Sequence, residues 1–379
     1  MPEEYKIINT SDGRAWVRSS RLRELREVDA IIFDCDGVLV DTRRSYDAAI
    51  AEVVDRLLRW IGFRLPWKRF APSLILRLRR TGGFNNDWDS VYALILFSIL
   101  SLTESEVRRL VNEDWQKASD ERKPSILPVG VRAVMDGVVA FTRNFCSKDG
   151  VIGYESVNRF VQTNTFSPVY ASALGRVREW LSYPGGPPTG LLSTIFDELY
   201  HGSKLFRQMY GVPARYHRGR GLIEEERMLV RRRDLEAISK LSGRGRLAIT
   251  TGRPYLPTKY VLGDLMAYFN RKASIFIGDM DLHPELASKL AQFRKPSGLS
   301  LVDARRALSS GMVLYVGDSA EDIMMVEAAR RLKEPVLFAG TYGTGLDPNE
   351  QSRYLKEQYA DLILPTARQI PFILGSVKG

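Results

Sequence analysis

The feature that most constrains the fold is a set of short apolar runs, each bounded by turn residues. The first covers residues 30–33, and the others follow much later, at 246–250, 274–278, 312–316, 336–339 and 362–364. Short apolar runs of this kind are expected for strands that are buried on both faces in a parallel sheet. Segments with helical character, such as 322–332, separate the later runs. Alternating strands and helices predict an α/β fold with a doubly wound parallel sheet.

The long stretch between the first and second runs has a helical pattern instead. Ala49, Val53 and Leu57 are four residues apart, which predicts an amphipathic helix ending near Gly62. Further helices are expected at 74–80, 89–100, 104–118, 191–200 and 224–241. The chain is therefore predicted to form a discontinuous α/β domain, 1–44 with 242–379, and an inserted all-α domain, 45–241.

Two carboxylates follow the first apolar run directly. Asp34 and Asp36 lie where the expected strand ends, just before Gly37. Open α/β sheets bind their ligands at this end of their strands. Two like charges this close are costly to bury unless a cation or another partner compensates them. The pair therefore indicates a catalytic or metal-binding site.

Composition limits the kinds of partner. The formal net charge of +10 would suit nucleic acid, an acidic membrane or a small anion, but the arginines are dispersed, which favours solvated helix faces. Three scattered histidines predict no zinc site, and Cys35 and Cys146 predict no disulfide framework. The start of the chain lacks an apolar signal segment, and the run at 91–102 is too short to span a bilayer. We expect a cytoplasmic protein with no membrane partner.

Four motifs occur in order, each just after an expected strand or turn: DCDGVLVDT at 34–42, TTGRP at 250–254, RKPSG at 294–298 and GDSAED at 317–322. Together they resemble the motifs of the haloacid dehalogenase (HAD) superfamily, in the branch with a helical cap after the first motif (class I, type A-like). The resemblance covers the α/β parts of the chain, 1–44 and 242–379. It implies a doubly wound HAD core with an inserted all-α cap.

The resemblance also implies roles for the acidic residues. Asp34 would be the nucleophile that forms an aspartyl-phosphate, and Asp36 would be the general acid and then the general base. Asp34, the backbone carbonyl of Asp36 and the side chain of Asp318 would bind Mg²⁺, a hard ion that prefers oxygen ligands.

The phosphate itself would be bound by the second motif. Thr251 and the backbone N–H of Gly252 would contact the transferring phosphoryl oxygens, with Thr250 as the alternative hydroxyl. Arg253, in the same motif, is assigned to the same phosphate-binding group.

Lys295 would neutralise charge on these oxygens. Gly298 stands where the family usually has a second proline, and nearby Lys289 stays open as the alternative lysine. Asp322 would hold Lys295 or support the metal, with Ser319 beside it. Ser319 and Asp322 also form the pattern of a capping box that opens a helix.

Two polar stretches interrupt the expected helical domain, GGFNNDWD at 82–89 and YHGSKLF at 200–206. They resemble a group of archaeal and bacterial HAD proteins, described as phosphatases, that carry GGFN-x-DWD and YxGxxLF sequences. Asn85, Asn86, Asp87 and Trp88 are interpreted either as a loop that closes over the substrate or as a helix N-cap with Trp88 packed in the cap core.

These features predict a Mg²⁺-dependent phosphatase for a small phosphorylated metabolite, because Asp36 supplies the acid that the leaving group of a phosphate monoester needs. A sugar phosphomutase of the same superfamily is the first alternative. A nucleic-acid-binding or scaffold protein on a HAD fold is the second. We expect no nucleic-acid partner, since no basic run is interleaved with aromatic residues. The substrate and the oligomeric state are not indicated.

Overall fold

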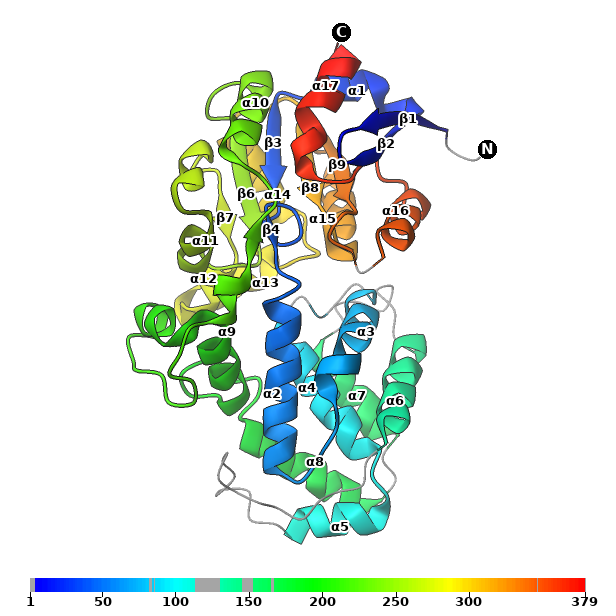
Figure 1. Ribbon diagram of the computed structural model, residues 1–379, viewed down its shortest axis with the longest axis vertical. Helices are drawn as coiled ribbons and strands as arrows, with labels where there is room; N and C mark the ends of the chain where they lie inside the picture. Colours follow the sequence, from blue (N-terminus) through cyan, green and yellow to red (C-terminus); the bar gives the residue numbers. More distant parts are fainter. Residues whose placement is uncertain are drawn as a thin grey trace. The chain divides into compact units, whose positions relative to one another are not determined.

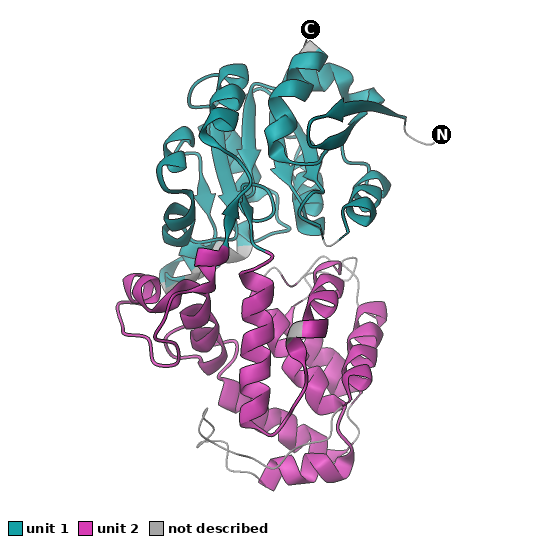
Figure 2. Ribbon diagram, viewed as in Figure 1, with its two compact units in different colours: residues 1–42, 226–379 teal, residues 43–225 magenta. Residues whose placement is uncertain are grey.

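A computed structural model describes residues 4–81, 84, 86–112, 130–144, 153–164, 167–345 and 347–378. The chain divides into two compact units, Met1–Thr42 with Glu226–Gly379, and Arg43–Glu225 (Figure 2). The first crossing between the units lies close to the expected boundary at 44. The second crossing comes at Glu226, well before the expected residue 242.

The first unit is built on a sheet with the strand order β1-β2-β10-β9-β8-β3-β6-β7 in the described residues. Its strands are β1 (Tyr5–Thr10), β2 (Gly13–Arg18), β3 (Ala30–Phe33), β6 (Leu247–Thr251), β7 (Ile275–Phe276), β8 (Val313–Gly317), β9 (Val336–Thr341) and β10 (Leu362–Leu364). The pairings from β10 to β7 are parallel, whereas β2 pairs antiparallel with β10 and β1. This arrangement confirms the predicted α/β fold.

Helices cover both faces of this sheet (Figure 1). The α-helices described in this unit are α1 (Leu22–Arg26), α10 (Arg232–Ser242), α11 (Tyr255–Leu262), α12 (Gly278–Asp281), α13 (Ala287–Phe293), α14 (Leu299–Ala307), α15 (Ala320–Arg331), α16 (Pro348–Glu357) and α17 (Ile370–Lys378). Successive strand residues point to opposite faces, so Phe33 packs in the core with α1, α10 and α17. Ile32 packs in the other core, with α14 and α15.

The hairpin formed by β1 and β2 was not predicted from the apolar pattern. β1 is the outer strand and is partly exposed, with Ile7 57 % exposed. Because a strand at the edge of a sheet does not need apolar residues throughout, β1 lacks the apolar run that marks the central strands. Ala15 and Val17 are buried at alternate positions of β2. The Ser-Asp turn at residues 11–12, followed by Gly13 and this alternation, is the signal that could have indicated a hairpin.

The second unit is helical in its described residues. It contains α2 (Tyr46–Trp60), α3 (Trp67–Arg79), α4 (Asp87–Leu100), α5 (Glu104–Asn112), α6 (Val131–Asn144), α7 (Tyr154–Thr163), α8 (Pro168–Leu181), α9 (Leu191–Tyr210) and the short 3₁₀ helix η4 (Leu222–Glu225). The helix α4 is almost wholly buried, in agreement with its largely apolar sequence. Residues 113–118 of the helix expected at 104–118 lie outside the described residues.

The prediction of one helix over 224–241 was wrong. After η4 the chain forms β5 (Arg227–Met228), which pairs antiparallel with β4 (Val40–Asp41), and only then α10. Leu235 and Ile238 of α10 are buried in the core of the α/β unit. These contacts place residues 226–241 with the α/β unit rather than with the helical one.

Among the described residues, no single helix has both the length and the apolar composition of a membrane span. One bent pair, α4 with α5, meets these criteria only when its two helices are taken together.

Candidate active site

The turn after β3 brings the first motif close to the fourth. Asp34 continues the strand pairing, with its N–H donating to the carbonyl of Val316 at 2.8 Å. The chain then turns at Gly37, whose φ of +71° favours glycine. A Cβ on Gly37 would lie 1.8 Å from Oδ2 of Asp318. Glycine is therefore needed here for both the turn and the close approach of the carboxylate.

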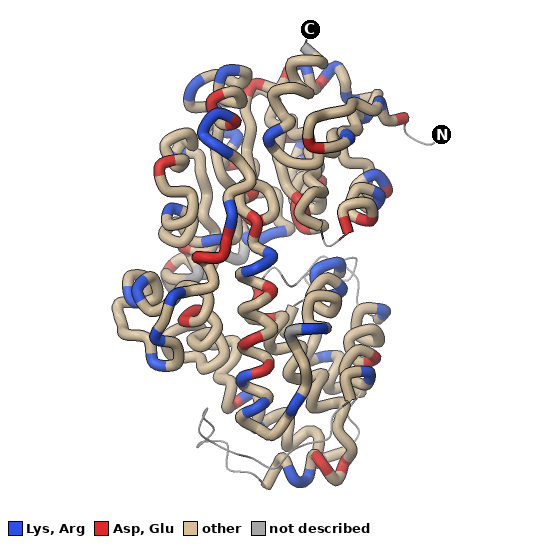
Figure 3. Tube along the Cα trace, in the orientation of Figure 1, with Lys and Arg blue, Asp and Glu red and all other residues tan. Residues whose placement is uncertain are grey.

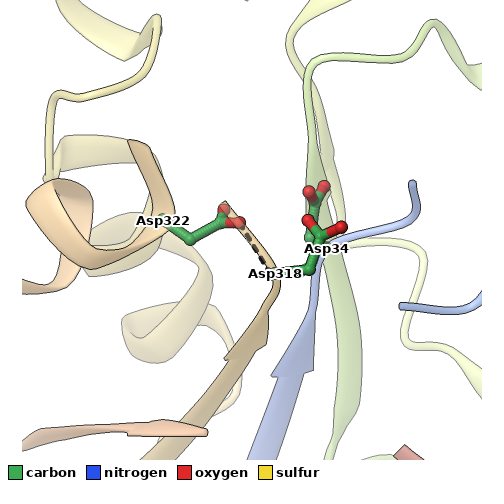
Figure 4. Close-up of side chains that lie close together, drawn as sticks. All are labelled: Asp34, Asp318 and Asp322. Atoms are coloured by element: carbon green, nitrogen blue, oxygen red, sulfur yellow. Dashed lines mark hydrogen bonds between the residues drawn. The ribbon is translucent and has the colours of Figure 1, made fainter. Parts of the chain in front are cut away.

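Three carboxylates gather at the ends of two neighbouring strands. Asp34 follows β3, Asp318 follows β8, and Asp322 lies in the first turn of α15. One oxygen of each lies within 4.8 Å of the others. Asp34 and Asp318 point beyond the strand ends in the same direction, whereas Asp322 points toward the backbone of Asp318 (Figure 4).

The oxygens of Asp322 are already occupied by donors of the protein. Oδ1 accepts from the Lys295 Nζ at 2.6 Å and from the Tyr315 hydroxyl at 2.8 Å. Oδ2 accepts from the Ser319 hydroxyl and from the backbone N–H groups of Ser319 and Asp318, at 2.7 to 3.1 Å. Burial alone would raise the pKa of Asp322, but Lys295 and these donors lower it below its usual value. Asp322 is therefore a fixed anion that organises its neighbours, and with Ser319 it forms the expected capping box.

Lys295 connects this anchor to Asp34. Its Nζ lies 2.6 Å from Asp322 and 3.0 Å from Oδ2 of Asp34, and the side chain is almost fully buried. Burial lowers the pKa of Lys295, but the two carboxylates outweigh burial and raise the pKa well above its usual value. Lys289 is exposed, with its Nζ over the ring of Phe293 at 5.1 Å. Of the two lysines, the structure thus brings Lys295 to Asp34.

Lys295 compensates the charge of Asp34 and Asp318 only in part. Burial raises the pKa of Asp34 to about 7, with Lys295 opposing this shift and Asp322 and Asp36 adding to it. Burial, Asp322 and Asp34 likewise raise the pKa of Asp318 well above its usual value. Within the described part of the chain, no donor reaches the side-chain oxygens of Asp318. Two such carboxylates with free lone pairs fit a hard divalent cation.

The second motif ends β6. Thr251 is buried, and its Oγ1 accepts from the backbone N–H of Arg253 at 3.2 Å. Thr250 is also buried, but it points to the other face of the strand, and its Oγ1 has no hydrogen-bond partner in the described structure. Gly252 forms the turn after Thr251.

Arg253 has partners that differ from the expected phosphate. Its side chain is fully buried and donates to both oxygens of Glu226, at 2.8 and 3.1 Å, and to Oδ1 of Asp36. Asp36 itself stays partly accessible, with its side chain 32 % exposed. The guanidinium therefore bridges two carboxylates instead of facing solvent.

In the helical unit, the predicted loop residues have partners of their own. Asn86 is the N-cap of α4 and accepts from the N–H of Trp88 at 3.0 Å. Asp87 pairs with Arg79 at 2.9 Å, and the Trp88 Nε1 donates to Asp197 at 3.0 Å. These contacts agree with the N-cap interpretation. Asn85 lies outside the described residues.

Three residues of this region were not identified from the sequence. Tyr315 lies inside an apolar strand, so its hydroxyl contact with Asp322 had no local signal. Glu226 reaches Arg253 only because β5 pairs with β4. Asp279 lies outside the four motifs, and it accepts from the N–H of Tyr255 at 2.7 Å, where α11 begins.

Comparisons with known proteins agree with the family resemblance of the sequence motifs. A family model described as haloacid dehalogenase-like hydrolase matches residues 28–330. No curated protein matches the chain.

Several solved structures are similar. One is an X-ray structure of a Northeast Structural Genomics Consortium target, with a TM-score of 0.56 at 19 % identity, covering 92 % of this chain and 99 % of that one. Phosphatase Tt82 from Thermococcus thioreducens has a TM-score of 0.45 at 22 % identity, covering 86 % and 98 %. A conserved haloacid dehalogenase-like protein of unknown function from Agrobacterium tumefaciens has a TM-score of 0.39 at 14 % identity, covering 93 % and 100 %. The first of these resembles the chain in fold.

Proposed function

Because the chain belongs to the haloacid dehalogenase-like hydrolases, we propose that it is a Mg²⁺-dependent phosphatase acting on a small phosphorylated metabolite. The observation that carries this proposal is the environment of Asp34. One of its oxygens lies 3.0 Å from the buried Lys295, and its other close neighbours include Asp318, whose side chain no described donor reaches. Such a carboxylate can attack phosphorus if a cation reduces its repulsion of the phosphate.

The residues present fit the metal that the family uses. Asp34, Asp318 and the backbone carbonyl of Asp36 would hold it, whereas Asp322 is excluded because its oxygens already accept from the protein. Mg²⁺, when bound, would neutralise charge on the carboxylates and on the phosphate.

The side chains then account for a two-step hydrolysis. In the first step an oxygen of Asp34 bonds to phosphorus, the bond to the leaving oxygen breaks, and Asp36 gives that oxygen its proton. In the second step water attacks phosphorus and passes a proton to Asp36, while the bond between Asp34 and phosphorus breaks. Inorganic phosphate leaves, and both side chains return to their starting states. Lys295 and Thr251, with the N–H of Gly252, would stabilise the phosphoryl oxygens in both steps.

The distribution of charge supports a small substrate. Lys and Arg residues are interspersed with Asp and Glu along both units (Figure 3). A nucleic-acid partner would be expected to require a concentrated basic surface with aromatic side chains for stacking. We therefore infer a phosphorylated small molecule as the partner.

The test is phosphate release from a panel of metabolites by wild type, Asp34→Asn and Asp279→Asn. Asp279 is a matched control, because it lies in α12 just after β7 and, among the described residues, accepts from the N–H of Tyr255 at the start of α11. We expect Asp34→Asn to be inactive, Asp279→Asn to be active, and EDTA to inactivate wild type until Mg²⁺ is restored. Phosphate release by Asp34→Asn would contradict the proposal. Conversion of a hexose phosphate to its isomer without phosphate release would identify a mutase instead.

A further inference from the structure

The second motif was expected to bind phosphate, but the contacts of Arg253 indicate a different role for this residue. Its guanidinium spans two carboxylates, pairing with both oxygens of Glu226 and with Oδ1 of Asp36. The side chains of Arg253 and Glu226 are fully buried, whereas that of Asp36 is partly exposed. A planar guanidinium held on one side by two hydrogen bonds has little freedom to rotate, so the group that it holds on the other side is also fixed.

The backbone of Glu226 is fixed to the same turn that carries Asp36. Glu226 is the first residue of the α/β unit after the chain leaves the helical unit. It directly precedes β5, in which Met228 pairs with Val40 of β4, and the N–H of Leu229 donates to the carbonyl of Leu39 at 2.8 Å. Val40 also forms an isolated β-bridge with Asp36 through the backbone. The segment through which the chain re-enters the α/β unit is thus connected to Asp36 by both backbone and side chain.

We propose that Glu226 and Arg253 form a positioning pair that orients Asp36 for proton transfer, and that Arg253 does not bind the substrate phosphate. The proposal rests on the proposed function, in which Asp36 protonates the leaving group. Proton transfer requires the acid to lie within hydrogen-bond reach of the leaving oxygen, so its efficiency depends on the position of the carboxyl group. Glu226 contributes by keeping the buried charge of Arg253 compensated.

This role predicts a dependence on the leaving group. An aryl phosphate such as p-nitrophenyl phosphate releases a stable phenolate and has little need of an acid, whereas an alkyl phosphate releases a strongly basic alkoxide and depends on one. Misplacing Asp36 should therefore lower kcat/KM for the alkyl ester more than for the aryl ester. Loss of a phosphate ligand, or partial unfolding, would lower both together.

The experiment measures kcat/KM for p-nitrophenyl phosphate and for the alkyl monoester of the panel that wild type hydrolyses fastest. The variants are Glu226→Gln and Arg253→Lys, each alone and combined with Asp36→Asn. Glu334→Gln is a matched control, because Glu334 is a largely buried carboxylate that pairs with Arg305 and Arg306. It follows the C-terminal end of α15, the end opposite Asp322. Thermal melts of all variants show which of them are folded.

We expect the alkyl-to-aryl ratio of kcat/KM to fall about tenfold in Glu226→Gln and Arg253→Lys, a part of the ~10²- to 10⁴-fold that general acid catalysis supplies. Glu334→Gln should keep the wild-type ratio. Combined with Asp36→Asn, the two changes should have little further effect on the ratio, since the acid is already lost.

Two results would overturn the positioning role while leaving the proposed function intact. One is a folded Glu226→Gln variant with the wild-type ratio. The other is a rise of about tenfold in the inhibition constant of inorganic phosphate in Arg253→Lys without a change in ratio, which would make Arg253 a phosphate ligand. Failure of wild type to hydrolyse any monoester would instead overturn the proposed function, and the positioning role with it.

Discussion

The raised pKa of Asp34 predicts that its neutralisation stabilises the protein. The carboxyl group is buried, and its pKa rises from the usual 3.8 to about 7 in the protein without a metal. At ~1.4 kcal/mol for each pKa unit, this difference means that the ionised carboxylate destabilises the folded protein by at most ~4 kcal/mol at a pH above 7. The value already includes the attraction of Lys295. Asp34→Asn removes this penalty, but its single amide oxygen replaces two carboxylate oxygens, one near Lys295 and one that accepts from the N–H of Cys35, so we expect a gain below this limit, of about 2 kcal/mol.

The sign of the pH dependence follows from the direction of the shift. Because the pKa is higher in the folded protein, the folded state binds more protons between 3.8 and about 7. The stability of wild type should therefore fall as the pH rises through this interval, and that of Asp34→Asn should not show this fall. Near pH 4 the wild-type carboxyl is protonated in the folded state, and the difference between the two proteins should vanish.

Calorimetric unfolding of both proteins in EDTA, at about pH 4.5 and pH 8, measures this difference. Added Mg²⁺ should raise the stability of wild type at the higher pH by binding only the folded state, and should do so much less for the variant. A variant that is less stable than wild type at pH 8 in EDTA would refute the reasoning. A stability difference that does not change with pH would refute it as well.

Two further substitutions test the geometry. Gly37→Ala places a Cβ 1.8 Å from Oδ2 of Asp318, so we expect a loss of about 100-fold in kcat/KM, as is typical of a displaced reactive group. Gly263→Ala is its control, because Gly263 also has positive φ but has open space around it; equal losses in both variants would contradict the role of the close approach. Lys295→Met leaves two buried carboxylates without their cation and should cost about 3 to 5 kcal/mol in urea unfolding. Lys289→Met, on the surface, should change stability by less than about 0.5 kcal/mol. A similar loss of stability in both lysine variants would contradict the role of Lys295 as the cation that compensates the buried carboxylates.

Much of the α/β core could be predicted because its signals are local. A short apolar run closely followed by Asp marks a buried strand with a carboxylate at its end, and this pattern located Asp34 and Asp318, whereas Thr251 was preferred to Thr250 through the family resemblance. Parallel pairing then brings strand ends together without further information: Asp34 and Asp318 meet because β3 and β8 are neighbours. The second crossing was misplaced because the acidic segment before α10 has a helical pattern, while its pairing with β4 depends on distant residues.

The partners of Arg253 could not be predicted for the same reason. Its neighbours in sequence place it in a phosphate-binding motif, but its contacts are set by Glu226, which arrives from the other end of the inserted unit. Tyr315 is a similar case, since a tyrosine in a buried strand gives no indication of what its hydroxyl meets. Lys295 could be separated from Lys289 only when the structure showed which one is buried beside Asp34.

The most direct test of the account is to detect the phosphorylated side chain. Asp36→Asn should form the aspartyl-phosphate from p-nitrophenyl phosphate and hydrolyse it slowly, because the base that activates water is missing. Acid-quenched samples, digested and analysed by mass spectrometry, should show the mass of one phosphoryl group on the peptide that contains Asp34. The adduct should be absent from the Asp34→Asn, Asp36→Asn double variant. A phosphoryl group on another residue, or an adduct that persists without Asp34, would contradict the assignment of Asp34 as the nucleophile.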